Sequence, residues 1–132
     1  MQHSTYTKIY LGGRIFMSLW FGASGFFELT RSPVVWDITL QLGYPAHFIY
    51  ILGIFKIVGS IIFLIPNRFN RIKEWIFAGM FFDITFAFFS KIVVLGLPSA
   101  IDAIIAFIVL AITYYAFNKI HFIDYTENLS QD

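Results

Sequence analysis

The chain has 132 residues, of which 58% are hydrophobic, 20% aromatic and 13% charged, and its formal net charge is +1. With a mean hydropathy of +0.74, it has too few charged side chains to cover the surface of a soluble globule of this size. The composition therefore favours an integral membrane protein in contact with a lipid bilayer. The small net charge and the absence of a basic stripe argue against a nucleic-acid partner.

The chain contains no cysteine, which excludes disulfides, thiol redox relays and cysteine-ligated metals. Its histidines, His3, His47 and His121, lie at a terminus, a segment edge and a polar tail, and no two have the i, i+4 spacing of metal ligands on one helix face. We therefore expect no metal site. No arrangement of nucleophile and base is visible either, so the sequence predicts no catalytic residue and no evident cofactor.

Four hydrophobic segments follow one another at about residues 9–27, 48–65, 73–90 and 97–117. Each approaches the ~20 residues that a helix needs to cross a hydrocarbon core of ~30 Å. None shows the regular alternation of a spanning β-strand. The sequence predicts an all-α, membrane-embedded four-helix bundle that forms a single domain over residues 1–132, with a polar C-terminal tail at 118–132.

The first segment has an alternative interpretation as a cleaved secretory signal peptide. Arg14, however, lies inside what would be the apolar core of that peptide, and no A-x-A-like cleavage site follows. We therefore expect this segment to be retained as the first helix.

The connection between the first and second segments has a pattern of its own. Turn-rich stretches at 30–33 and 42–45 flank a mixed stretch, and Trp36, Leu40 and Tyr44 recur there at helical spacing. This pattern favours a short interfacial helix that caps the outer end of the bundle.

The basic residues predict the orientation in the membrane. The short connection after the second segment carries Arg68, Arg71 and Lys73 with only Glu74 beside them, and the positive-inside rule places such a loop in the cytoplasm. An even number of crossings then places both termini in the cytoplasm. The Ile-, Phe- and Lys-rich composition, without a transit or secretion signature, suits the cytoplasmic (inner) membrane of a bacterium.

Each segment also carries one face of small and polar residues at i, i+3 and i, i+4 spacing. These faces are Arg14, Ser18, Gly22, Gly25 and Glu28; Gly53, Lys56, Gly59 and Ser60; Gly79, Asp83, Ala87 and Ser90; and Asp102, Ala106, Val109 and Thr113. Small residues allow helices to approach closely in lipid. We therefore expect the four faces to meet inside the bundle and the Phe, Ile and Leu faces to contact lipid.

Two opposite charges near the middle of apolar segments, Lys56 and Asp83, are the first candidates for a ligand-binding site. A lone charge at the bilayer centre costs about 2.5 to 3.5 kcal/mol on insertion scales, so mutual compensation is expected. At the helical rise they lie about 14 Å and about 10 Å below the outer ends of their segments, which predicts a pair near the midplane. Such a pair is either a structural brace or the centre of a small-ligand site.

Four further charged residues are candidates for the same site. Arg14 and Glu74 both lie toward the cytoplasmic ends of their segments and are predicted to form a second pair, whereas Glu28 and Asp102 gather with Lys91 toward the outer end. Asp102 also suits the positive dipole end of the fourth helix. For each of these residues, a snorkelling side chain or a helix-end partner is an equally good interpretation.

Several short motifs occur in a distinctive order and spacing. They are Leu42-Gly43-Tyr44-Pro45, Leu52-Gly53-x-x-Lys56-x-x-Gly59, Leu64-x-Pro66 and Lys73-Glu74-Trp75-x-x-Ala78-Gly79-x-x-x-Asp83-x-x-x-Ala87. Taken together, they resemble the DoxX-like family of small four-helix membrane proteins over most of the chain. In that family pattern a His often follows the Ser at the end of the third helix, whereas this chain has Ser90-Lys91.

The resemblance implies a membrane protein but not a reaction. The broader group includes a membrane subunit of a thiosulfate:quinone oxidoreductase, and other relatives look like accessory or chaperone-like membrane proteins. Because no catalytic arrangement is visible, we favour a non-catalytic or partner-dependent membrane subunit. In this hypothesis the aromatic-rich bundle holds a quinone-like headgroup, with Lys56 donating to its carbonyls and Asp83 fixing the charge of Lys56 or carrying a proton.

Two other hypotheses stay open. In the first, the polar core is purely structural, and the outer cap or the exposed aromatic faces contact a membrane protein partner or a second copy of the chain. The second is a transporter or channel, which is less favoured. Transporters commonly use repeated halves and broken helices, whereas the halves of this chain show only faint similarity and its polar residues are of mixed sign.

Overall fold

The computed structural model describes residues 2–65 and 69–131. Pro66 and Arg68, which belong to the predicted cytoplasmic connection, lie outside the described residues. Across the described part the chain is all-helical, as predicted, without a strand. Its elements are α1 (Gln2–Leu29), α2 (Pro33–Gln41), α3 (Ala46–Leu64), α4 (Asn70–Leu95), the 3-10 turn η1 (Leu97–Ala100) and α5 (Ile101–Gln131).

Several helices extend beyond the hydrophobic segments that predicted them. α1 begins at Gln2 instead of near residue 9, and α5 continues to Gln131 through the polar stretch that was predicted as a tail. Hydropathy does not detect these extensions because they are polar, although Lys, Gln and Glu are good helix formers. The imidazole of His3 lies 3.2 Å from a carboxylate oxygen of Asp124, so the two extensions lie side by side.

Three parts of the chain are helical, long and apolar enough to cross a membrane. They are α3, α4 and the stretch Leu97–Gln131, which contains η1 and α5. α1 is long enough but less apolar, because Arg14 and several glycines and serines interrupt its hydrophobic residues. A helix pairs its backbone hydrogen-bonding groups internally, which explains why apolar segments in lipid take this form.

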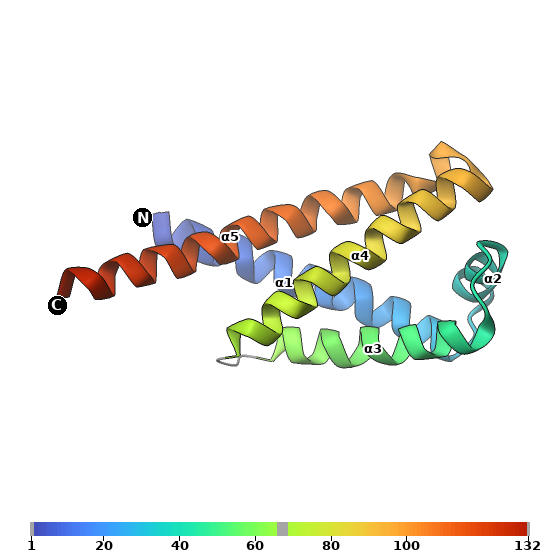
Figure 1. The fold of residues 1–132 in the computed structure, drawn as a ribbon, viewed down its shortest axis with the longest axis horizontal. Helices are drawn as coiled ribbons and strands as arrows, with labels where there is room; N and C mark the ends of the chain where they lie inside the picture. The colour runs from blue at the N-terminus through green and yellow to red at the C-terminus, as the bar shows by residue number, and fades with distance from the viewer. Residues whose placement is uncertain (1, 66–68, 132) are drawn as a thin grey trace.

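The long helices change neighbours along the bundle (Figure 1). Both termini lie at the same end of the molecule, where α1 runs beside α5. At the opposite end α4 and α5 lie together, while α1 and α3 lie together and carry α2. The two helix pairs diverge there.

A mainly aromatic core joins the helices on the side of the termini. The ring of Phe77 on α4 contacts Phe63 of α3 at 5.0 Å and Phe117 of α5 at 5.3 Å between ring centroids. Met17 of α1 and Leu110 of α5 are fully buried in the same cluster. Rings in such contact geometries stabilise each other beyond simple burial.

The prediction that the small and polar faces meet inside the bundle is correct for α1 and wrong for α4. On α1, Ser18, Gly25 and Glu28 are buried. On α4, Gly79 is exposed and Asp83 is half-buried. The buried residues of α4 are Lys73, Phe77, Met80 and Ile84. The large apolar side chains of α4 fill the aromatic core. The face of α4 that carries its small residues therefore points away from this core.

Glycine sets the distance between α1 and α3. A Cβ atom on Gly25 would lie 2.7 Å from the carbonyl oxygen of Gly53 and 2.9 Å from the Cβ of Lys56. Real side chains do not tolerate contacts this short, so a residue larger than glycine at Gly25 would push the two helices apart. The close approach of small residues replaces the hydrophobic effect, which does not drive helices together in lipid.

We predict that Gly25→Leu lowers the free energy of unfolding by about 1 to 3 kcal/mol, because the new side chain overpacks the contact between α1 and α3. Unfolding in mixed detergent and dodecyl sulfate micelles, followed by circular dichroism, measures this change. Gly12→Leu is the matched control, because nothing lies within 4 Å of a Cβ on Gly12. Equal losses in the two variants would contradict the proposed contact.

Candidate functional site: a charged cavity between the helix pairs

Three charged side chains meet where the helix pairs begin to diverge. The Nζ atom of Lys56 on α3 lies 2.8 Å from Oε1 of Glu28 on α1 and 3.7 Å from Oδ2 of Asp83 on α4. Lys56 also donates a hydrogen bond of 3.1 Å to the hydroxyl of Ser24. One ammonium group therefore links three long helices. We refer to Glu28, Lys56 and Asp83 as the charged triad.

The triad is nearly closed off from solvent. Glu28 is 2% exposed, and the side chains of Lys56 and Asp83 are 10% and 22% exposed. The second carboxylate oxygen of Glu28, Oε2, is buried and has no hydrogen-bond partner. Tyr10, Arg14, Ser18 and Ser60 also have a buried unpaired side-chain atom, but among the described residues Glu28 alone has one on a carboxylate, where the lack of a partner is costly.

The sequence predicted the contact between Lys56 and Asp83 but missed the shorter one. Glu28 was expected to lie with Lys91 and Asp102 toward the outer end, yet it is the nearest carboxylate to Lys56. The signal was present in the spacing. Because α1 and α3 run antiparallel, Gly25 lies opposite Lys56 and Gly53 lies opposite Glu28, so the two charges stand about one helical turn apart and the long side chain of Lys56 bridges them.

The triad faces a cavity of about 660 Å³ between the diverging helix pairs. α1, α2 and α3 line one side of the cavity, and α4 and α5 line the other. Most of the lining is apolar or aromatic, including Trp20, Phe27, Phe48, Phe82 and Phe86. The small face of α4, which the sequence analysis expected to pack, instead forms cavity wall with Gly79, Asp83 and Ala87.

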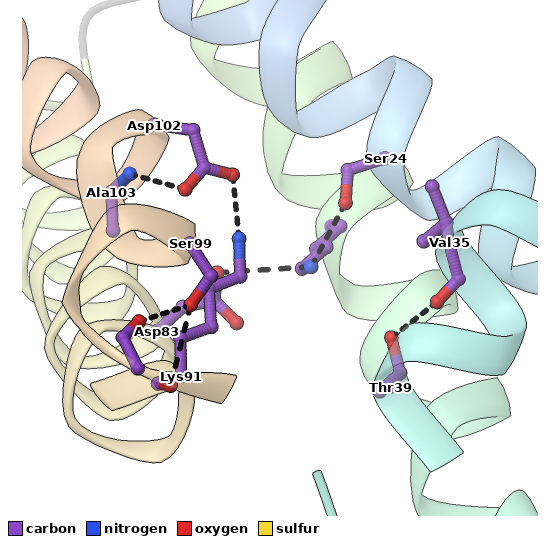
Figure 2. Close-up of polar contacts among 10 residues, drawn as sticks. Ser24, Val35, Thr39, Asp83, Lys91, Ser99, Asp102 and Ala103 are labelled. Atoms are coloured by element: carbon purple, nitrogen blue, oxygen red, sulfur yellow. Dashed lines mark hydrogen bonds and ion pairs between the residues drawn. The ribbon is translucent and has the colours of Figure 1, made fainter. Parts of the chain in front are cut away.

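A second ion pair lies on the far wall of the same cavity. Lys91 at the end of α4 donates a hydrogen bond of 2.6 Å to Asp102, which lies in the first turn of α5 as predicted. Figure 2 shows Asp83, Lys91 and Asp102 on one side and Ser24 of α1 opposite them, with Thr39 of α2 beyond. Lys91 lines the cavity, so this position supplies a cation to it.

α2 forms the outer wall and is fastened at both ends. The guanidinium of Arg31 lies 5.2 Å from the ring centre of Trp36 and donates a hydrogen bond to the hydroxyl of Tyr50 on α3. Past the other end of α2, the hydroxyl of Tyr44 lies 3.0 Å from that of Ser90, which connects the α2–α3 turn to α4 across the cavity. The short helix exists as predicted, but these contacts were not foreseen.

Arg14 and Glu74 do not form the predicted pair and do not line the cavity. Arg14 donates a hydrogen bond of 3.2 Å to the carbonyl oxygen of Leu64, near the end of α3. Glu74 accepts one of 3.1 Å from the hydroxyl of Tyr114 on α5. The helix-end interpretation therefore fits Arg14, because the last carbonyls of a helix lack internal donors.

A sequence profile of the DoxX-like family matches residues 14–115. The chain belongs to the DoxX-like family. The matched stretch contains every residue of the charged triad as well as Lys91 and Asp102. No curated protein and no solved structure matches the chain. Membership in this family, together with three helices apolar enough to span a bilayer, identifies an integral membrane protein.

The cavity of this DoxX-like protein has the composition of a binding site. It combines an apolar lining with a few convergent polar groups, which is the usual composition of a small-molecule site. The hydroxyl groups that face it, those of Ser24, Thr39 and Tyr44, have no neighbouring histidine to act as a base among the cavity residues. The site can therefore hold and orient a molecule through charge and hydrogen bonds.

We predict that Lys56→Met lowers the free energy of unfolding by about 3 to 5 kcal/mol, because it leaves two carboxylates without their counter-charge. Adding Glu28→Leu to Lys56→Met is expected to recover part of this loss. Lys91→Met is the matched control, because the exposed Asp102 makes that pair worth only about 1 kcal/mol or less. Chemical unfolding in detergent measures all three changes. Additive losses in the double variant would contradict a coupled triad.

Proposed function

We propose that this protein is a non-catalytic or partner-dependent membrane subunit that holds a small amphiphilic molecule in the cavity between its helix pairs. The polar end of that molecule lies against the charged triad, and its apolar body lies along Trp20, Phe27, Phe82 and Phe86. The observation that carries this proposal is the unpaired Oε2 atom of Glu28, buried beside a cavity of about 660 Å³.

The structural brace is the competing interpretation of the triad. A structural brace needs only equal numbers of positive and negative charges. Apolar packing generally stabilises a protein equally well. The triad instead has two carboxylates for one ammonium, and one carboxylate oxygen has no partner. The excess of acceptors supports a ligand at this position.

The hydrogen-bond geometry also bears on the quinone hypothesis. An ammonium group has three N–H donors. Two of those of Lys56 bond to Ser24 and Glu28, and the third faces Asp83 at 3.7 Å, so a quinone carbonyl would have to compete with Asp83 for this N–H. The atom left over is an acceptor, Oε2 of Glu28. The site therefore favours a headgroup that donates a hydrogen bond over one that only accepts.

In the membrane we place α1 beside the three more apolar helices as a fourth crossing. Both termini and the α3–α4 connection then face the cytoplasm, and α2 and η1 lie at the outer surface. The location of both termini at one end supports this topology, as do Arg71 and Lys73 near the start of α4. We propose the inner membrane of a bacterium as the location.

The ligand proposal predicts that a small molecule co-purifies with the protein in mild detergent. Native mass spectrometry of the intact protein is expected to show a stoichiometric added mass. Gly79→Phe fills the cavity from a position whose Cβ meets nothing within 4 Å, and this variant is expected to lose the added mass. The triad itself stays intact in this variant.

Gly12→Phe is the matched control, because Gly12 is also free of contacts but lies outside the cavity lining. It is expected to keep the added mass. If the wild-type protein carries no small molecule, or if both variants carry it equally, the cavity is not its site and the structural interpretation of the triad gains support.

The topology is testable by single cysteines because the chain has none of its own. A membrane-impermeant maleimide, added to intact spheroplasts, is expected to label Asp37→Cys on α2. It is expected to label Asn128→Cys on α5 only after lysis. Both positions are exposed. The opposite pattern would invert the topology. Labelling of both positions in spheroplasts would require an even number of crossings between them and would contradict the three crossings proposed for α3, α4 and α5.

A further inference from the structure

We infer that the cavity selects a protonated amine with an apolar body, and that the ammonium group of this ligand sits against the acidic side of the charged triad, formed by Glu28 and Asp83. This inference rests on the proposed binding function and adds the chemical class of the ligand. It follows from three properties of the cavity: its charge, its hydrogen-bond acceptors and its aromatic lining.

The charges that line the cavity do not balance. Glu28, Asp83 and Asp102 are acidic, and Lys56 and Lys91 are basic. Three carboxylates against two ammonium groups leave one negative charge in excess. An uncompensated charge among apolar side chains is unfavourable, and a cationic ligand removes it. A neutral headgroup would leave the excess in place.

The acidic side of the triad requires a donor as well as a positive charge. The ammonium of Lys56 already faces Ser24, Glu28 and Asp83, and Lys91 is bound to Asp102. Oε2 of Glu28 has no such partner but is itself buried, whereas Asp83, 22% exposed and 3.7 Å from Lys56, presents its carboxylate to the cavity. A primary ammonium supplies both the charge and an N–H donor at this position.

The aromatic lining accommodates the rest of such a ligand. Trp20, Phe27, Phe82 and Phe86 are among the residues that line the cavity. A cation near a ring face is attracted by the ring quadrupole, and the same rings bury an apolar body. The ammonium of Lys56 already lies 5.8 Å from the ring centre of Phe21, so cations are found next to aromatic rings in this region.

The test compares three probes of the same length that differ in the headgroup. They are 4-phenylbutylamine, which is a cation and a donor at neutral pH, 4-phenylbutanol, which is a neutral donor, and 4-phenylbutyrate, which is an anion. Isothermal titration of the full-length protein in detergent, with matched detergent blanks, measures each affinity. We expect saturable one-to-one binding of the amine, at least about tenfold weaker binding of the alcohol, and no measurable binding of the acid.

Glu28→Gln is expected to weaken binding of the amine at least about tenfold and to leave the affinity for the alcohol unchanged, since the substitution removes charge but keeps a polar side chain. Glu74→Gln is the matched control, because Glu74 lies outside the cavity lining, and it is expected to bind the amine as the wild type does. If Glu28→Gln does not yield folded protein by size-exclusion chromatography and circular dichroism, Asp83→Asn takes its place with the same expectation.

Equal affinity for amine and alcohol, or an amine affinity that Glu28→Gln and Asp83→Asn leave unchanged, would overturn the inference. A neutral molecule that co-purifies and is lost in Gly79→Phe would then still support the binding function, so the two proposals fail separately.

A primary ammonium also occurs in the phosphatidylethanolamine headgroup. The titration is therefore repeated in micelles doped with that lipid and, separately, with phosphatidylglycerol at the same mole fraction. Displacement of the amine by phosphatidylethanolamine alone assigns the ammonium to a lipid, and displacement by neither assigns it to a free amine. Displacement by phosphatidylglycerol as strongly as by phosphatidylethanolamine would count against recognition of the ammonium.

Discussion

The contact of the Lys56 ammonium with two carboxylates is the interaction on which the rest of the site depends. Glu28, Lys56 and Asp83 come from α1, α3 and α4, so a single cation sets the positions of three helices at the level where the helix pairs diverge. On one side of this level the aromatic core closes the bundle, and on the other the cavity opens. In lipid, where apolar packing gives little drive to association, such a polar link has unusual weight.

The glycine contact and the charged triad form one structural unit. Gly25 and Gly53 let the backbones of α1 and α3 approach, and one helical turn further along each helix stand Glu28 and Lys56. The close approach allows Glu28 and Lys56 to form an ion pair of 2.8 Å between the two helices. The other oxygen of Glu28, Oε2, stays buried and without a hydrogen-bond partner.

Hydropathy and charge were enough to predict the helical class, the long apolar helices and the contact between Lys56 and Asp83. They could not predict which face of a helix is buried, because that depends on which large side chains pack in the interior. On α4 both faces are plausible, because Gly79 and Asp83 suit close packing while Phe77 and Met80 suit a core. The aromatic contacts of Phe77 with Phe63 and Phe117 decided the rotation of the helix, and these partners are far apart in sequence. The Arg14–Glu74 pair failed for a similar reason, since each found a nearer partner in Leu64 and Tyr114.

Brace and binding site are compatible roles for the same three residues. The bond between Lys56 and Oε1 of Glu28 is sufficient to join α1 and α3, and it uses only one oxygen of that carboxylate. Asp83, at the longer distance of 3.7 Å, contributes charge from α4 without a hydrogen bond. The same ammonium therefore links the helices and fixes the carboxylate of Glu28 beside the cavity. A site built this way is preorganised, because the helices that carry it cannot separate without breaking the ion pair, and preorganisation lowers the entropy that a ligand loses on binding.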